Sequence, residues 1–145
     1  MKRAILSAAI LLAACATAPV DDAGAPAAAG IPSAPIELGD WRSASEAETS
    51  AAFEQQVGAR YARGVAISAV RADLRRNDFA CAPNTTPSNG RGDPPNQICR
   101  KSATAGNCTH TWQVHLFETG DALARARAIY DRRCGADGLL GGPGR

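Results

Sequence analysis

Large apolar and aromatic side chains are scarce in this chain of 145 residues, of which only 5% are aromatic. A small domain with few of them builds a thin hydrophobic core, and such domains usually need covalent cross-links to stay folded. Long apolar runs are lacking too. Residues 4–12 form an apolar stretch of nine, whereas a helix needs about 20 residues to cross a bilayer. We therefore expect one small stapled domain and no anchor helix at the N-terminus.

Catalytic motifs are equally scarce. His110 and His115 are the only histidines, and five residues apart on a strand their side chains point to opposite faces. We expect one of them to pack beside Trp112 and the other to lie on the surface. No serine lies in a nucleophile elbow, and no carboxylates form a paired motif. The sequence thus predicts a protein that is not an enzyme and binds no cofactor; a small hydrolase would need a histidine-centred site that it does not show.

Charge is unevenly distributed along the chain, although the net charge is only +2. Residues 15–59 contain one arginine and seven carboxylates, whereas residues 60–133 contain twelve Lys/Arg and six carboxylates. A basic domain favours anionic neighbours such as lipid headgroups or an acidic protein face. A solubilising surface explains the same pattern. Nucleic acid is not an expected partner, because the basic residues do not interleave with aromatic ones.

The N-terminus carries the most specific motif of the chain. Met1-Lys2-Arg3 is a short positive segment, residues 4–12 are apolar, and Leu12-Ala13-Ala14-Cys15 follows. These features resemble the signal peptide and lipobox of bacterial lipoproteins. The resemblance implies that residues 1–14 are removed and that Cys15 is acylated, which anchors the protein stably in a membrane when more than one chain is attached.

The same resemblance implies a location in the bacterial cell envelope. Position 16 is alanine, which in this family is typical of sorting to the outer membrane, facing the periplasm. An ordinary secretory leader with an incidental cysteine is the alternative.

Composition divides the rest of the chain into three parts. Residues 15–39 hold the lipid-attachment cysteine and four of the nine prolines, which predicts a flexible tether with a root-mean-square reach of about 28 Å. Residues 40–134 hold most of the large apolar residues and predict the folded domain. Residues 135–145 predict a flexible glycine-rich tail.

A first helix is predicted over residues 46–62, with Gly64 ending it. Ser45 and Glu48 fit a capping box at its start. Its apolar positions recur every four residues, at Phe53, Val57 and Tyr61. Trp41 is expected to pack against this helix.

A second helix is predicted over residues 66–76. Its apolar side consists of Ile67, Val70 and Leu74, and its solvated side of Arg71, Asp73, Arg75 and Arg76. Asn77 suits the left-handed position that ends a helix. Residues 79–81 then form a short extended segment before a Pro/Gly/Asn-rich loop over residues 82–97.

Three strands are predicted after this loop. Residues 108–117 alternate in character and are rich in β-branched and aromatic side chains, and residues 97–103 precede them across a turn. For residues 122–130, alanine and arginine favour a helix, but alternation and a short turn at residues 118–121 favour a strand, which we choose. The expected fold is α+β: two N-terminal helices followed by a small three-stranded antiparallel sheet.

Four cysteines remain once Cys15 is acylated, and an even number in an exported domain predicts two disulfides. A hairpin centred near residues 119–120 brings Cys108 towards Cys134, which leaves Cys81 for Cys99. The other pairings remain open. Zinc is not expected, because the cysteine spacings match no zinc knuckle.

This order of elements resembles the small α-α-β-β-β lipoproteins of the outer-membrane assembly machinery, the BamE/SmpA type, in layout, lipobox and a second helix that follows Gly64. We therefore expect a membrane-anchored envelope lipoprotein, without metal, that binds an envelope protein partner or supports assembly. An inhibitor or sensor of an envelope enzyme, acting through the loop over residues 82–97, is the alternative.

Overall fold

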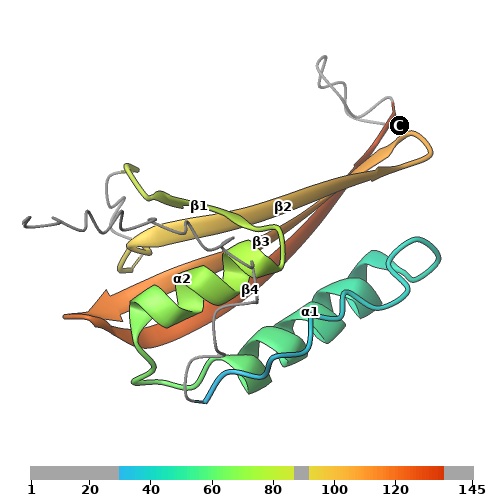
Figure 1. Cartoon of the computed structure of the whole chain (residues 1–145). Helices are drawn as coiled ribbons and strands as arrows, with labels where there is room; N and C mark the ends of the chain where they lie inside the picture. Colours follow the sequence, from blue (N-terminus) through green and yellow to red (C-terminus); the bar gives the residue numbers. More distant parts are fainter. Residues whose placement is uncertain (1–29, 87–91, 136–145) are drawn as a thin grey trace, which may run out of the picture.

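Two helices lie against one face of a four-stranded antiparallel sheet (Figure 1). The computed structural model describes residues 30–86 and 92–135. The elements are α1 (Glu46–Arg60), α2 (Ile67–Arg76), β1 (Ala80–Pro83), β2 (Gln97–Ala105), β3 (Cys108–Thr119) and β4 (Ala122–Cys134). The strands neighbour one another in chain order. The α+β class and the order of helices before an antiparallel sheet are confirmed.

The prediction of three strands is wrong, because β1 adds a fourth. All four of its residues pair with β2, from Ala80 opposite Arg100 to Pro83 opposite Gln97. The proline stands at the end of an edge strand, where a missing amide donor is tolerated. The predicted short extended segment is therefore a strand of the sheet.

Helix α1 starts as predicted and ends earlier. The hydroxyl of Ser45 accepts from the amide of Glu48 at 3.2 Å, and the Ser45 amide donates to the Glu48 carboxylate at 2.9 Å, which confirms the capping box. The helix ends at Arg60, since Tyr61 leaves the helical conformation with φ −113° and ψ 88°. Gly64, with φ +88°, turns the chain towards β4 rather than ending the helix.

Helix α2 ends at Arg76 as predicted, but the left-handed residue is Asp78, with φ 64°. The amide of Asp78 donates to the carbonyl of Arg75 at 3.0 Å, and that of Phe79 to the carbonyl of Leu74 at 2.9 Å. This is a Schellman ending. Asn77, expected in the left-handed position, has φ −96° and is buried.

The long hairpin of β3 and β4 confirms that residues 122–130 form a strand. Its register runs from Cys108 opposite Cys134 to Thr119 opposite Ala122, with one irregularity between Phe117 and Glu118. Both two-residue hairpin turns begin with a glycine of positive φ, at Gly106 and Gly120. Glycine is favoured at that position in type II′ turns.

The core lies between the helices and the inner face of the sheet. Four alternate residues of β3 are at most 3% exposed there: His110, Trp112, Val114 and Leu116. Trp41 makes its ring contacts with this strand, at centroid distances of 4.6 Å to His110 and 5.1 Å to Trp112. Trp41 also belongs to the same core cluster as Phe53 and Val57 of α1.

Part of the segment predicted as a tether belongs to the folded domain. Ile31 and Ile36 are 5% and 8% exposed and pack in the core cluster. The tether prediction is therefore wrong for residues 30–39, because two isoleucines among the prolines provide apolar anchors that the Ala/Pro/Gly composition obscured. Residues 1–29, which include the signal peptide and Cys15, and residues 136–145 of the tail lie outside the described residues.

Two disulfides cross-link the sheet. Cys81 is bonded to Cys99 and Cys108 to Cys134, the pairing that the hairpin register favoured. In each case the two cysteines face each other across neighbouring strands. The first bond fixes β1 to β2, and the second closes the open end of the β3–β4 hairpin.

Candidate binding surface

One face of the sheet is turned away from the helices (Figure 1). Its side chains are a mixed set of exposed and half-buried ones. We call it the outer face. Strand register arranges its residues in rows across β2, β3 and β4. From the end near the β3–β4 turn, they are Phe117 and Arg125; Ile98, His115 and Arg127; Arg100, Gln113 and Ile129; Ser102, Thr111 and Asp131; Thr104, Thr109 and Arg133.

Positive charge gathers at one end of this face. Arg100, Arg125 and Arg127 are exposed, and among the described residues none forms an ion pair with a carboxylate. Arg125 stacks over the ring of Phe117, 3.9 Å from its centroid. Arg100 donates from Nε to the side-chain oxygen of Gln113 at 3.2 Å. Neutral neighbours thus hold Arg100 and Arg125, and no carboxylate in the described part of the chain compensates the charge of any of the three guanidinium groups.

The opposite end of the outer face is closer to neutral. Arg133 pairs with Asp131 at 2.9 Å, and the remaining residues of this end are serine and threonine. On the outer face, the unpaired positive charge therefore lies at the end near the β3–β4 turn.

The two histidines lie on opposite faces, as predicted. His110 is 3% exposed beside Trp112, and its Nδ1 lies 2.6 Å from the hydroxyl of Tyr130. Burial, with Arg132 and Arg42 nearby, lowers the pKa of His110 below its usual value. Its neighbours are the rings of Trp41 and Trp112 and the phenol of Tyr130, so its contacts are those of a core residue.

His115 lies in the basic end of the outer face. Burial first, and then the charges of Arg127 and Arg100, lower its pKa. The lowered pKa favours the neutral form of the imidazole. Its ring nitrogen Nε2 lies 3.4 Å from Gln113 Oε1.

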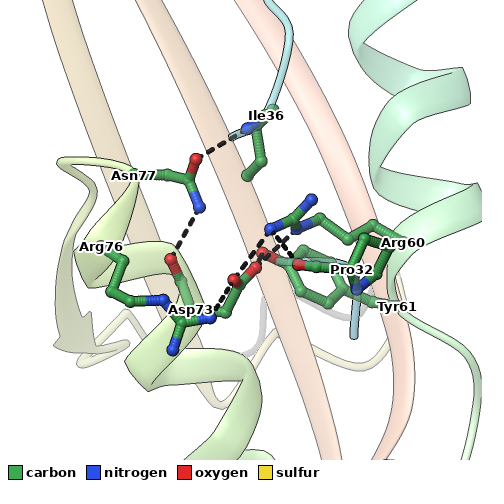
Figure 2. Close-up of polar contacts among 7 residues, drawn as sticks. All are labelled: Pro32, Ile36, Arg60, Tyr61, Asp73, Arg76 and Asn77. Carbon is green, nitrogen blue, oxygen red and sulfur yellow. Dashed lines mark hydrogen bonds and ion pairs between the residues drawn. The ribbon is translucent and has the colours of Figure 1, made fainter. Parts of the chain in front are cut away.

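A buried polar network joins the two helices on the other side of the sheet (Figure 2). The carboxylate of Asp73 accepts from Arg60 Nε at 2.6 Å and Nη2 at 2.9 Å, and from the hydroxyl of Tyr61 at 2.7 Å. Arg76 pairs with it at 2.6 Å. Burial alone would raise the pKa of Asp73, but the hydrogen bonds from Arg60 and Tyr61 outweigh it and the pKa lies below its usual value.

The same network holds the N-terminal segment. Arg60 Nη2 donates to the carbonyl of Pro32 at 2.8 Å, and the amide of Ile36 donates to the side chain of Asn77 at 2.7 Å. Asn77 donates in turn to the carbonyl of Asp73 at 2.9 Å. Figure 2 shows Pro32 and Ile36 reaching these groups from one passing segment. The chain enters the domain in the helix layer.

The sequence placed Asp73 on the solvated side of α2, and this is wrong, because its side chain is fully buried. A helical repeat of three and four residues from Val70 passes through Asp73, Leu74 and Asn77, so both polar residues lie on the apolar side. That spacing was the signal in the sequence that Asp73 is buried. The spacing could not show that Arg60 of α1 neutralises the buried carboxylate.

Neither a metal site nor a membrane span is found among the described residues. No group of three or more His, Cys, Asp or Glu there is arranged to hold an ion. No described helix is both long and apolar enough to cross a bilayer.

Comparisons with known proteins do not assign the chain to a class. No protein-family model matches it, and neither a curated protein nor a solved structure does.

Proposed function

We propose that this protein is a lipid-anchored lipoprotein of the bacterial envelope, attached through Cys15 in the outer membrane and facing the periplasm. Its domain acts as a non-enzymatic binding module for an envelope protein. The lipobox-like sequence before Cys15 supports the anchor. The observation that carries the binding role is the outer face, where three arginines are displayed without acidic partners among the described residues.

The course of the N-terminal segment supports an orientation for the proposed module. Described residues begin at Gly30, and Ile31, Pro32 and Ile36 are fixed beside α1 and α2. Only residues 16–29 would then separate Cys15 from the domain, and a flexible chain of that length has a root-mean-square reach of about 20 Å. Because this attachment lies in the helix layer, the helices would face the membrane and the outer face would point away from it.

The anchor is tested by the mass of the mature protein purified from the membranes of a Gram-negative host. We expect cleavage before Cys15, an added mass equal to its acyl chains, and incorporation of labelled palmitate. Cys15→Ser should abolish both the added mass and the label. Mature protein without acyl mass, and with four thiols open to alkylation, would refute the anchor.

The binding role is tested by photo-crosslinking in intact envelopes, with a photoreactive residue at Thr111 on the outer face. We expect a discrete crosslinked protein that is lost in Arg125→Glu/Arg127→Glu. The matched control is Arg63→Glu/Arg75→Glu, which makes the same change of charge at exposed positions near the helices. Equal crosslinking in both variants would show that the outer face is not the binding site.

A second candidate function is an inhibitor or sensor of an envelope enzyme. It is favoured by the 82–97 loop, whose two ends are held together by hydrogen bonds at its base. The amide of Asn84 donates to the carbonyl of Asn96 at 2.9 Å, and its side chain donates to the carbonyl of Pro95 at 3.0 Å. A pocket of about 450 Å³ adjoins this base, lined in part by Pro94, Phe117 and Arg125. Deleting residues 87–91, which spares the base, should abolish inhibition of a target enzyme if this alternative holds, and should leave crosslinking from Thr111 unchanged if it does not.

A further inference from the structure

Among the described residues, little of the chain pairs with the outer edge of β4. Of that part, only residues 64–67 lie along the edge, where Gly64 donates to the carbonyl of Leu123 and the Leu123 amide donates to Val65, both at 2.8 Å. Within the described chain, the remaining residues of the strand, 124–134, make no backbone hydrogen bond on that side. A long free edge is a template for another strand, and folded proteins normally cover it or protect it with charge.

A groove runs beside this edge. Its volume is about 430 Å³, and consecutive residues of β4, from Ala126 to Tyr130, form one side. Helix α1 forms the other side with Ser50, Glu54, Val57 and Gly58. A side-chain carbon built at Gly58 would meet nothing within 4 Å, so glycine leaves open space here that no packing requirement explains.

We propose that the free edge of β4 binds an extended, acidic peptide segment of a partner protein, which adds to the sheet as a fifth strand. This deepens the proposed binding role and rests on it. Recognition by strand addition obtains affinity from main-chain hydrogen bonds and specificity from alternate side chains.

Charge on β4 indicates the composition of that segment. Side chains of an added strand on the outer face would lie beside Arg125 and Arg127, which have no acidic partner among the described residues. Carboxylates there would be favoured, since opposite charges on neighbouring strands attract. Side chains on the inner side would meet Val57, Ala128 and Tyr130, with Glu54 nearby, so small apolar residues fit there and acidic ones do not.

The same charges argue against two other occupants. A second copy of β4 carries four arginines and one aspartate, so pairing two such edges would bring together strands of like net charge, which is unfavourable. An anionic membrane would meet the outer face only if the domain turned its tethered helix layer away from the bilayer.

The experiment uses the mature protein in neutral detergent and two synthetic probes, a blocked peptide of alternating Glu and Val and its Lys/Val counterpart. Repulsion among the glutamates keeps the first peptide from pairing with itself. We expect the Glu/Val peptide to bind at least tenfold more tightly than the Lys/Val peptide. It should also slow amide hydrogen exchange in residues 124–130 and leave exchange in β1 unchanged.

Position 58 provides a matched pair of variants. Gly58→Ala leaves the groove open and should retain binding, whereas Gly58→Phe fills the groove and should weaken binding of the Glu/Val peptide at least tenfold. The double variant Arg125→Glu/Arg127→Glu should also weaken binding of the Glu/Val peptide at least tenfold. Unfolding midpoints of all variants show whether each is folded.

Four results would overturn the inference: equal binding to both Gly58 variants, no preference for the acidic peptide, protection confined to other strands, or dimers that form through β4. Binding to phosphatidylglycerol vesicles but not to the peptide would show that Arg125 and Arg127 bind a lipid surface, and would overturn the inference too. If the mature protein carried no acyl mass on Cys15 and still bound the Glu/Val peptide, the anchor would be refuted and the strand addition would stand.

Discussion

The guanidinium of Arg60 and the carboxylate of Asp73 lie 2.6 Å apart, with side-chain exposures of 5% and 0%. They join the last turn of α1 to the middle of α2, and Arg60 also holds the carbonyl of Pro32. A buried charge that loses its partner is costly, so the pair makes the helix layer dependent on both residues.

Asp73→Ala should therefore lower the free energy of unfolding by about 3–5 kcal/mol, because it leaves the Arg60 charge buried without a partner. Urea unfolding followed by far-UV circular dichroism measures the loss. The control is Asp131→Ala, since Asp131 pairs with Arg133 at 2.9 Å but the side chains of Asp131 and Arg133 are 44% and 78% exposed. An exposed pair contributes less than about 1 kcal/mol. Similar losses in the two variants would contradict the role given to Asp73.

The pH dependence of stability should reveal the same carboxylate. The pKa of Asp73 is lower in the folded chain than in the unfolded one, so its contribution is complete above the unfolded value of about 3.9 and is lost as the pH falls through the folded value. The difference in unfolding free energy between the native chain and Asp73→Asn should stay constant from pH 7 to about pH 5 and shrink below about pH 4. A difference in unfolding free energy that grows on acidification would show that folding raises the pKa of Asp73 instead of lowering it.

The disulfides should contribute similar amounts of stability in different places. Closing loops with sequence separations of 18 and 26 residues is worth about 3–4 kcal/mol each by loop entropy. We expect Cys81→Ser/Cys99→Ser and Cys108→Ser/Cys134→Ser each to lose about this much on urea unfolding. Hydrogen exchange should quicken mainly in β1 for the first pair and at the open end of the β3–β4 hairpin for the second. Faster exchange across the whole sheet in both variants would contradict this local assignment.

The N-terminal segment should behave as part of the domain. A chain that begins at Asp40 lacks Ile31 and Ile36, whose burial contributes about 1.5–3 kcal/mol each, and it leaves Asn77 without a partner for its side-chain oxygen. We expect its urea midpoint to fall clearly below that of a chain beginning at Gly30. The Gly30 chain should match the full mature protein, and equal midpoints for both truncations would mean that the segment adds nothing.

Local signals in the sequence predicted local structure well. The capping box at Ser45 and Glu48 located the start of α1, and alternation across residues 122–130 identified β4 even though alanine and arginine favour a helix. The hairpin register indicated the disulfide pairing, because strand pairing fixes which cysteines face each other. These features depend on neighbours in the chain or on one short turn.

Features that depend on distant residues were missed. Ile31 and Ile36 are isolated apolar residues among prolines, and nothing local indicates that α1 and α2 offer them a site. The burial of Asp73 depends on Arg60, thirteen positions earlier, reaching it from another helix. The groove beside β4 depends on how α1 lies against the sheet, so Gly58 appears in the sequence only as an ordinary helix position.

The cross-linking of the sheet also bears on how the domain would respond to mechanical load. Covalent bonds join β1 to β2 and β3 to β4, and a two-residue turn joins β2 to β3. Tension applied at Gly30 would meet the bonds of Pro32 and Ile36 first and would peel that segment away one contact at a time. The strands would keep their alignment while the helix layer yields, so a pull at the membrane end would loosen the domain without opening its sheet.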